Sequence, residues 1–157
     1  DFPEVTFKQG DVLNNDSVNE KYDVITMLGV LCIFDDYKVV LENALSWLNP
    51  NGRLILHNMI SDFDIDVFVK YKSPSLSFEP SELESGWNII SHKTLSLIAE
   101  ANNARIISSK NFNLEVKLDK QDDVMRSWTE ENMSGGNDIF NALHIRQPQK
   151  IVTIKKV

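Results

Sequence analysis

The sequence predicts an α/β fold in which helices pack on both faces of a mostly parallel sheet, and three consecutive segments support this prediction. Residues 22–31, YDVITMLGVL, form a nearly continuous apolar run, as in a strand that is buried on both faces. Residues 37–48 place apolar side chains on one face at helical spacing, and residues 53–60 form a second apolar run. This order predicts two parallel neighbouring strands joined by a right-handed crossover.

The composition is that of one soluble globular domain. The chain has 157 residues, of which 42% are hydrophobic and 25% are charged. The net charge of −7 and the lack of a long basic run argue against nucleic-acid binding and favour a small-molecule substrate. Cys32 is the only cysteine, which excludes an intrachain disulfide and is typical of a reducing compartment. No apolar run approaches the ~20 residues of a membrane helix, so we expect a cytoplasmic protein that does not bind a membrane.

The N-terminal part is expected to hold one further strand. Residues 4–11, EVTFKQGD, alternate apolar and polar side chains and end in Gly-Asp, which predicts a short strand that runs into a turn. Asp35 and Asp36 precede the predicted helix, where carboxylates cap and stabilise a helix N-terminus. The turn residues NPNG at 49–52 are expected to end that helix.

The C-terminal part predicts a cap and a second strand and helix unit. Residues 61–90 are rich in aromatic residues and have no sustained period, which favours a cap or lid of short helices over the strand ends. Ser91 is expected to cap a helix that begins at residue 92, and a strand follows over 104–116, or as far as Leu118. After a weakly patterned stretch, with Gly135 and Gly136 as a loop tip, residues 150–157 predict a last strand.

Functional residues are expected where strands end, because doubly wound sheets bind ligands beyond the carboxyl ends of their strands. Three such ends can be located in the sequence. They are residues 10–12, residues 27–30 and residues 57–59.

The order of these motifs resembles the second half of a class I methyltransferase that uses S-adenosylmethionine. The matching motifs are VTFKQGD, YDVITMLGVL, the acidic cap with its amphipathic helix, and LNPNGRLILHN, which together cover roughly the first 60 residues. The turn in the last motif is similar to the family's Leu-Lys-Pro-Gly-Gly turn, from which Asn49 and Asn51 depart. Residues 85–112 also resemble, more weakly, the later part of small-molecule methyltransferases.

The resemblance implies a set of cofactor contacts. In the family, an Asp after the third strand faces the adenine amine and the next backbone N–H faces a ring nitrogen, which corresponds to Asp11 and Val12. The end of the fourth strand passes beneath the nucleoside, which corresponds to Leu28, Gly29 and Val30. From the residues alone, Asp11 could instead cap a turn, and the apolar residues at 28 and 30 could belong to the core.

The family's glycine-rich loop and its acidic ribose ligand would both precede Asp1. The six glycines of the chain include no Gly-x-Gly pattern after a strand. We therefore expect residues 1–157 to be a partial, Rossmann-like methyltransferase domain that lacks the N-terminal strand and helix units and is inactive by itself. Strand 22–31 would then have an open edge, which either residues 5–11 or a second copy of the chain would pair.

Further residues are candidates for the acceptor side of such a reaction. His57 stands where a general base for a hydroxyl acceptor could lie, although a lone His at a strand end is more often structural. Phe63, Tyr71 and Trp87 could line an acceptor pocket, or could bury the cap against the domain. The resemblance implies an in-line transfer of the sulfonium methyl group to an oxygen or nitrogen of a small molecule, which depends mainly on alignment of the reactants.

No metal site is predicted. Asp62, Asp64 and Asp66 alternate as in an EF-hand calcium loop, but Val67 stands where that loop has Gly and Ser73 where it has Glu. Two other functions remain open alongside methyl transfer. The chain could be a non-catalytic, methyltransferase-like binding module, or part of a nucleotide-dependent oxidoreductase.

Overall fold

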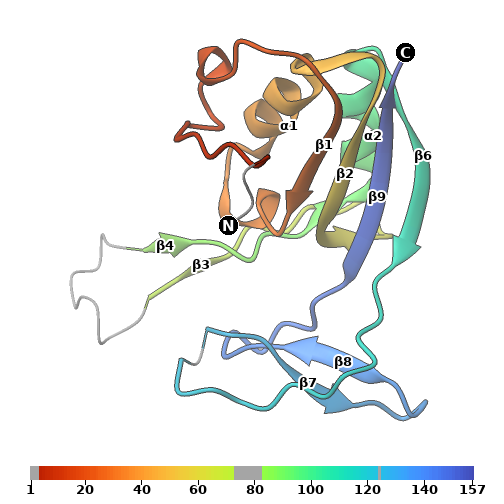
Figure 1. The fold of residues 1–157 in the computed structure, drawn as a ribbon. Coiled ribbons are helices and arrows are strands. Elements are labelled where there is room, and N and C mark those ends of the chain that lie inside the picture. Colours follow the sequence, from red (N-terminus) through yellow and green to blue (C-terminus); the bar gives the residue numbers. More distant parts are fainter. Residues whose placement is uncertain (1–3, 73–82, 124) are drawn as a thin grey trace.

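The computed structural model describes residues 4–72, 83–123 and 125–157, and its centre is a twisted main sheet (Figure 1). The strand order is β1 (Tyr22–Leu28), β2 (Leu48–Ser61), β9 (Gln149–Lys156) and β6 (Ala104–Asn111), and the short β5 (Ile90–Ser91) pairs with the end of β2. Strands β1 and β2 are parallel, as predicted, whereas β9 is antiparallel to both of its neighbours. The sheet is therefore mixed, with the parallel β1–β2 pair at one edge and a short parallel pairing of β5 with the end of β2.

Two helices cover one face of this sheet and form the core with it. They are α1 (Tyr37–Ser46) and α2 (His92–Ala101), which confirms both predicted helices. Ser91 caps α2 as expected, because its hydroxyl accepts a hydrogen bond from the backbone N–H of Thr94 at 3.0 Å. The core side chains with no accessible surface come from both helices and from β2, β5 and β9: Val40, Leu41, Ala44, Leu45, Leu54, Leu56, Ile60, Ile90, Leu95, Ala99, Val152 and Ile154.

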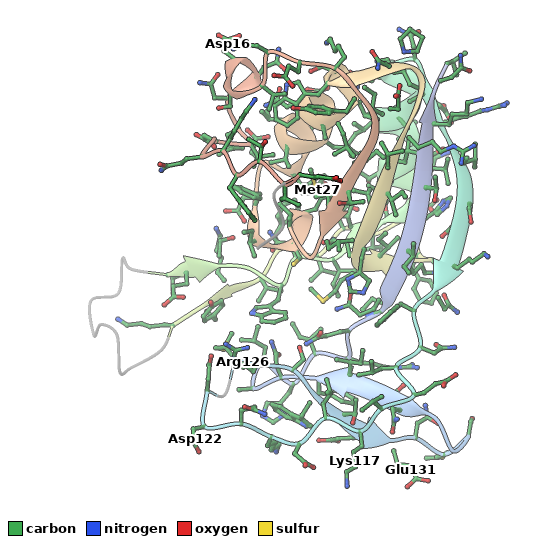
Figure 2. The ribbon with its side chains drawn as sticks, viewed as in Figure 1. Asp16, Met27, Lys117, Asp122, Arg126 and Glu131 are labelled. Atoms are coloured by element: carbon green, nitrogen blue, oxygen red, sulfur yellow. The ribbon has the colours of Figure 1, made fainter. Side chains whose placement is uncertain are left out.

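The prediction of helices on both faces is wrong for the described part of the chain. Both helices pack against the face that carries Met27, and Figure 2 shows Met27 among the side chains beside β1. The opposite face of β1 exposes Val24 and Leu28, which are 54% and 64% accessible. Strand β1 is also shorter than predicted, since it ends at Leu28, and within the described residues it pairs with β2 alone. An apolar run of this kind thus became an edge strand that is buried on one side.

The predicted strand at residues 4–11 is not formed. Residues 5–10 have no regular structure, and the side chain of Phe7 is 90% exposed. Consequently these residues do not pair with the open edge of β1, which was one of the two expected outcomes. The alternation of apolar and polar side chains does not produce a strand here, because neither side of the segment is buried against the domain. A one-turn 3-10 helix, η1 (Asn15–Ser17), follows instead.

The predicted N-terminal cap of α1 and the turn predicted to end this helix both differ in the structure. Asp36 is the N-cap residue of α1, but its side chain makes no capping hydrogen bond. The carboxylate of Asp35 instead accepts hydrogen bonds from Lys70, Ser85 and Asn88. The NPNG turn lies inside β2 as an irregularity in its pairing with β1, and Asn51 adopts a left-handed conformation with φ 65°.

Two hairpins extend beyond the main sheet (Figure 1). In the region 61–90, which was expected to contain short helices, the described residues form a hairpin of β3 (Lys70–Tyr71) and β4 (Glu84–Ser85), while residues 73–82 lie outside the described part. Strand β6 ends at Asn111, before the predicted 116 or 118.

The second hairpin follows β6 in the weakly patterned stretch. It consists of β7 (Trp128–Glu131) and β8 (Asn137–Phe140) and has Gly135 and Gly136 in its turn. Figure 2 shows Lys117, Asp122 and Glu131 on the side of this region that points away from the main sheet. Residues of β8 line a common cavity with residues from the ends of β2, β6 and β9. None of the helices in the described ranges has the length and apolar character required to cross a membrane.

Candidate active site at the strand ends

The carboxyl ends of β1 and β2 meet at one edge of the sheet because the two strands are parallel. A cavity of about 230 Å³ lies at this point. It brings together three residues that the sequence predicted from separate segments, namely Gly29, His57 and Trp87. The remaining lining residues are Cys32, Ile33, Asn58, Met59, Ser127, Gln147 and Gln149. We call this space the inner cavity.

Gly29 ends β1 with a left-handed backbone conformation, φ 70°. Its N–H donates a hydrogen bond to the carbonyl of His57 at 2.7 Å, which fixes the turn against β2. No atom lies within 4 Å of the position that a Cβ would occupy. The turn therefore presents bare backbone to solvent, where a flat ligand could approach closely. Leu28 beside it is exposed, and Val30 is half-buried and begins the 3-10 turn η2 (Leu31–Ile33).

His57 lies at the end of the parallel pairing of β1 with β2, and one of its ring nitrogens is buried without a partner in the described part of the chain. Its Nε2 atom is buried and has no hydrogen-bond partner among the described residues. The ring packs edge-on against Phe112, with ring centroids 4.6 Å apart. Burial lowers the pKa of the imidazole below its ordinary value, because an apolar environment disfavours the charged form. The imidazole is therefore neutral at pH 7, and a ligand in the cavity could supply the missing partner.

Two buried asparagines hold the segments around this cavity: Asn58, which lies at a predicted strand end, and Asn88, which the sequence analysis did not single out. Asn58, 1% exposed, accepts a hydrogen bond from the N–H of Cys32 at 3.1 Å and so fixes η2 beside β2. The side-chain oxygen of Asn88 accepts a hydrogen bond from the N–H of Val69, and its side-chain nitrogen donates one to the carbonyl of Phe34. An Asn within the apolar run LHNMI was a usable signal, since buried amides need specific partners. Burial raises the pKa of the Cys32 thiol, so the thiol stays protonated.

The three predicted acceptor residues occupy different places. Trp87 is half-buried, has φ 63° and lines the inner cavity. Phe63 is 78% exposed and lines a neighbouring cavity of about 520 Å³, which we call the outer cavity. Tyr71 lies in β3, donates a hydrogen bond to Glu84 at 2.9 Å, and is not among the lining residues of either cavity.

Asp11 and Val12 lie in the loop before η1 and not in either cavity. The Asp11 carboxylate accepts a hydrogen bond from the N–H of Leu13 at 2.9 Å, as a residue that stabilises a turn does. The carbonyl of Val12 accepts from the Asn43 side chain at 2.9 Å, which ties the loop to α1. The Val12 N–H has no partner within the described ranges. An exposed carboxylate and a free N–H thus stand side by side.

Of the alternating aspartates, Asp62 and Asp66 have partners, whereas Asp64 makes no hydrogen bond among the described residues. Asp66 accepts hydrogen bonds from the N–H of Ser91 at 2.6 Å and from the hydroxyls of Tyr37 and Thr94, each at 2.8 Å. Burial favours a higher pKa for Asp66, but these hydrogen bonds outweigh it and lower the pKa. Asp66 therefore joins α1, α2 and the segment that follows β2.

Comparisons with known proteins support the expected family resemblance. The sequence model of a family described as a methyltransferase domain matches residues 1–54. An O-methyltransferase family protein from Burkholderia thailandensis superposes with a TM-score of 0.52 at 12% identity, covering 96% of this chain. The YcgJ protein from Bacillus subtilis superposes with a TM-score of 0.51 at 14% identity, also covering 96%. The fold is that of the class I methyltransferases.

A third similar structure holds ligands. It is the 1,6-didemethyltoxoflavin-N1-methyltransferase of Burkholderia thailandensis with bound 1,6-didemethyltoxoflavin and S-adenosylhomocysteine, which has a TM-score of 0.51 at 14% identity over 91% of this chain. The chain spans 35%, 48% and 70% of the lengths of the O-methyltransferase family protein, the toxoflavin enzyme and YcgJ, respectively. No curated protein matches the chain in sequence.

Proposed function

We propose that the intact protein transfers a methyl group from S-adenosylmethionine to an oxygen or nitrogen of a small-molecule acceptor. The observation that carries this proposal is the inner cavity, where Gly29, His57 and Trp87 meet at the strand ends of a methyltransferase fold. The toxoflavin enzyme with its small-molecule and S-adenosylhomocysteine ligands supports the same substrate classes. Since the chain spans 35 to 70% of these neighbours, we propose the activity for the whole protein and not for these 157 residues alone.

The chain's own residues fit the nucleoside end of this cofactor. The carboxylate of Asp11 can accept from an exocyclic amine while the unpartnered N–H of Val12 donates to a ring nitrogen, which is the pattern of the adenine edge. The bare backbone at Gly29, between Leu28 and Val30, leaves room for a flat group. When bound, S-adenosylmethionine supplies a methyl group on a positively charged sulfur.

The remaining residues would position the acceptor and handle its proton. The inner cavity is lined by Ile33, Met59 and Trp87, which exclude water and hold the acceptor close to the methyl donor. A hydroxyl acceptor must also lose a proton, and the neutral His57 could accept it at Nε2. An amine acceptor would need only the alignment.

Calorimetry with S-adenosylhomocysteine on the intact protein tests the cofactor assignment. Asp11→Ala should weaken binding by about 1–3 kcal/mol, because it removes a hydrogen-bonding carboxylate. Asp16→Ala is the matched control, since Asp16 is also an exposed carboxylate close by and its side chain makes no hydrogen bond in the described part of the chain. Equal effects of the two variants would remove Asp11 from the site. Binding without turnover of any acceptor would favour the non-catalytic alternative.

The pH dependence of turnover tests His57. With a hydroxyl acceptor, kcat should rise as the imidazole loses its proton, through a pKa below the ordinary value for His, and then stay level at neutral pH. His57→Gln should lower kcat by about 10²-fold or more and abolish this rise. An unchanged profile in His57→Gln would show that the residue is structural.

We further propose that residues 61–90 form a lid that selects the acceptor. Trp87 reaches the inner cavity and Phe63 the outer cavity, whereas Tyr71 reaches neither. Trp87→Ala should therefore raise the KM for the acceptor with little change in cofactor affinity. Tyr71→Ala should raise the KM for the acceptor by a smaller factor. Equal losses in acceptor and cofactor binding for Trp87→Ala would point to a purely structural cap.

A further inference from the structure

The outer cavity has a wall that is rich in uncharged amides. It lies between the loop after β2, the end of β6 and the β7–β8 hairpin, and its volume of about 520 Å³ is that of a small-molecule site. Gln147 and Gln149 line it and the inner cavity alike, so the two spaces adjoin. Five carboxamide side chains contribute to its wall: Asn111, Asn113, Asn137, Gln147 and Gln149.

Two of these amides are free to bind a ligand. Gln149 donates to Gln147, and Gln147 also bonds Ser127, so this pair is already engaged. Asn111 and Asn113 are exposed, and their side chains make no hydrogen bond within the described residues. Each carboxamide offers both a donor and an acceptor without carrying a charge. The free amides therefore complement a ligand edge that alternates acceptors and donors.

Aromatic rings supply the surface on which a planar ligand would lie. Phe63 is largely exposed at the outer cavity, and Phe112 lines the same space. Phe112 also packs edge-on against His57, whose ring lines the inner cavity. A ring that stacks on these phenylalanines would thus lie next to the proposed reaction centre.

The charged groups of the outer cavity are already paired. The buried ammonium of Lys150, 8% exposed, bonds both carboxylate oxygens of Asp62 at 2.7 and 2.8 Å. Arg146 pairs with Asp138 at 2.9 Å, and its side chain is largely exposed to water, which screens its attraction for an anion. An anionic ligand would have to displace a carboxylate in a protein of net charge −7. This arrangement disfavours anions and favours an uncharged ligand.

We propose that the outer cavity binds the body of the methyl acceptor, and that this acceptor is an uncharged, planar, nitrogen-containing heterocycle. Asn111 and Asn113 would bond its edge and Phe63 and Phe112 its face, with its reactive atom directed toward His57. The identity of the ligand as a methyl acceptor rests on the proposed function, whereas its chemical class rests on the wall of the cavity alone.

The test uses lumazine as a neutral planar heterocycle and 2-naphthoate as an anionic aromatic of similar size. Binding of each to the protein is measured by ligand-observed NMR without any cofactor, at a mildly acidic pH at which lumazine is uncharged. Lumazine should bind at least about tenfold more tightly than 2-naphthoate. Asn111→Leu and Asn113→Leu should each weaken lumazine binding by about fivefold, the usual effect of one hydrogen bond.

Asn19→Leu is the matched control, because Asn19 is an exposed amide outside both cavities and without a hydrogen bond in the described part. It should leave lumazine binding unchanged. Tighter binding of 2-naphthoate, or lumazine binding that is indifferent to both Asn variants, would overturn the proposed ligand class. Because no cofactor is present, this result is independent of the calorimetry that tests methyl-donor binding.

Discussion

Asp66 is expected to be the most important carboxylate for the stability of the fold. It follows β2 and accepts three hydrogen bonds, from Ser91 at the start of α2, from Thr94 in its first turn, and from Tyr37 at the start of α1. Asp66→Ala removes all three at once and leaves the buried N–H of Ser91 without a partner. The donors lie at the start of both core helices, so the loss of these hydrogen bonds should lower the free energy of unfolding of the whole domain.

The size of this effect follows from the hydrogen bonds. A hydrogen bond to a charged group contributes about 1.5–3 kcal/mol when fully buried, and a half-buried one about 1 kcal/mol because water replaces part of it. Three bonds therefore give a loss of about 3 kcal/mol in the free energy of unfolding. For a domain of this size, each kcal/mol shifts Tm by about 2–4 °C, so Tm should fall by about 6–12 °C.

Urea unfolding followed by tryptophan fluorescence measures this loss. Asp64→Ala is the matched control, because Asp64 is an exposed aspartate two residues away and makes no hydrogen bond among the described residues. It removes the same charge and should change the free energy of unfolding by less than about 0.5 kcal/mol. If Asp66→Ala and Asp64→Ala are equally stable, the assignment of Asp66 as a link between the helices is incorrect.

The pH dependence gives a second check on Asp66. Its pKa is lower in the folded protein than the ordinary value for Asp, so its contribution to stability is fully present above the unfolded pKa. That contribution is lost as the pH falls through the folded pKa. The stability difference between wild type and Asp66→Ala should therefore be constant near pH 7 and shrink below about pH 4.

Three further predictions concern the core, the buried ion pair and the sheet edge. Leu54→Ala should cost about 3–5 kcal/mol in urea unfolding, because Leu54 is fully buried, whereas Leu28→Ala on the exposed face should cost less than about 0.5 kcal/mol. Asp62→Ala should destabilise the protein by about 1–3 kcal/mol, since it leaves the buried Lys150 ammonium unpaired; a loss within measurement error would show that water solvates this ammonium. Sedimentation should show concentration-dependent association through the open edge of β1, and Val24→Lys should reduce it; a monomer at all concentrations would contradict this.

The sequence alone predicted those elements whose signal is local. The helical spacing in 37–48, the Ser91 cap and the apolar runs of β1, β2 and β9 all correspond to observed elements. Burial of β1 could not be predicted in the same way, because it depends on which strands and helices lie beside it. An apolar run looks the same whether it becomes a central strand or, as here, an edge strand with one exposed face.

The candidate site was predictable only in part for the same reason. Gly29 and His57 could be singled out because they follow apolar strands, and Trp87 because it lies in an aromatic cap. The structure brings these three to one cavity. The amides of the outer cavity come from segments with no pattern of their own, and the β7–β8 hairpin that helps to enclose them was not predicted. Residues from such distant segments meet only through the tertiary fold.

The place of β9 in the sheet has a consequence for synthesis of the chain. This strand lies between β2 and β6, and its Lys150 pairs with Asp62, 88 positions earlier in the sequence. At a translation rate of about 5–20 residues per second, β2 waits for roughly 5–20 s after it leaves the ribosome before its neighbour emerges. During this time the edge of β2 that later pairs with β9 has no permanent partner. We therefore expect the nascent chain to need chaperone protection over this interval, and a mild slowing of translation after β2 to increase aggregation.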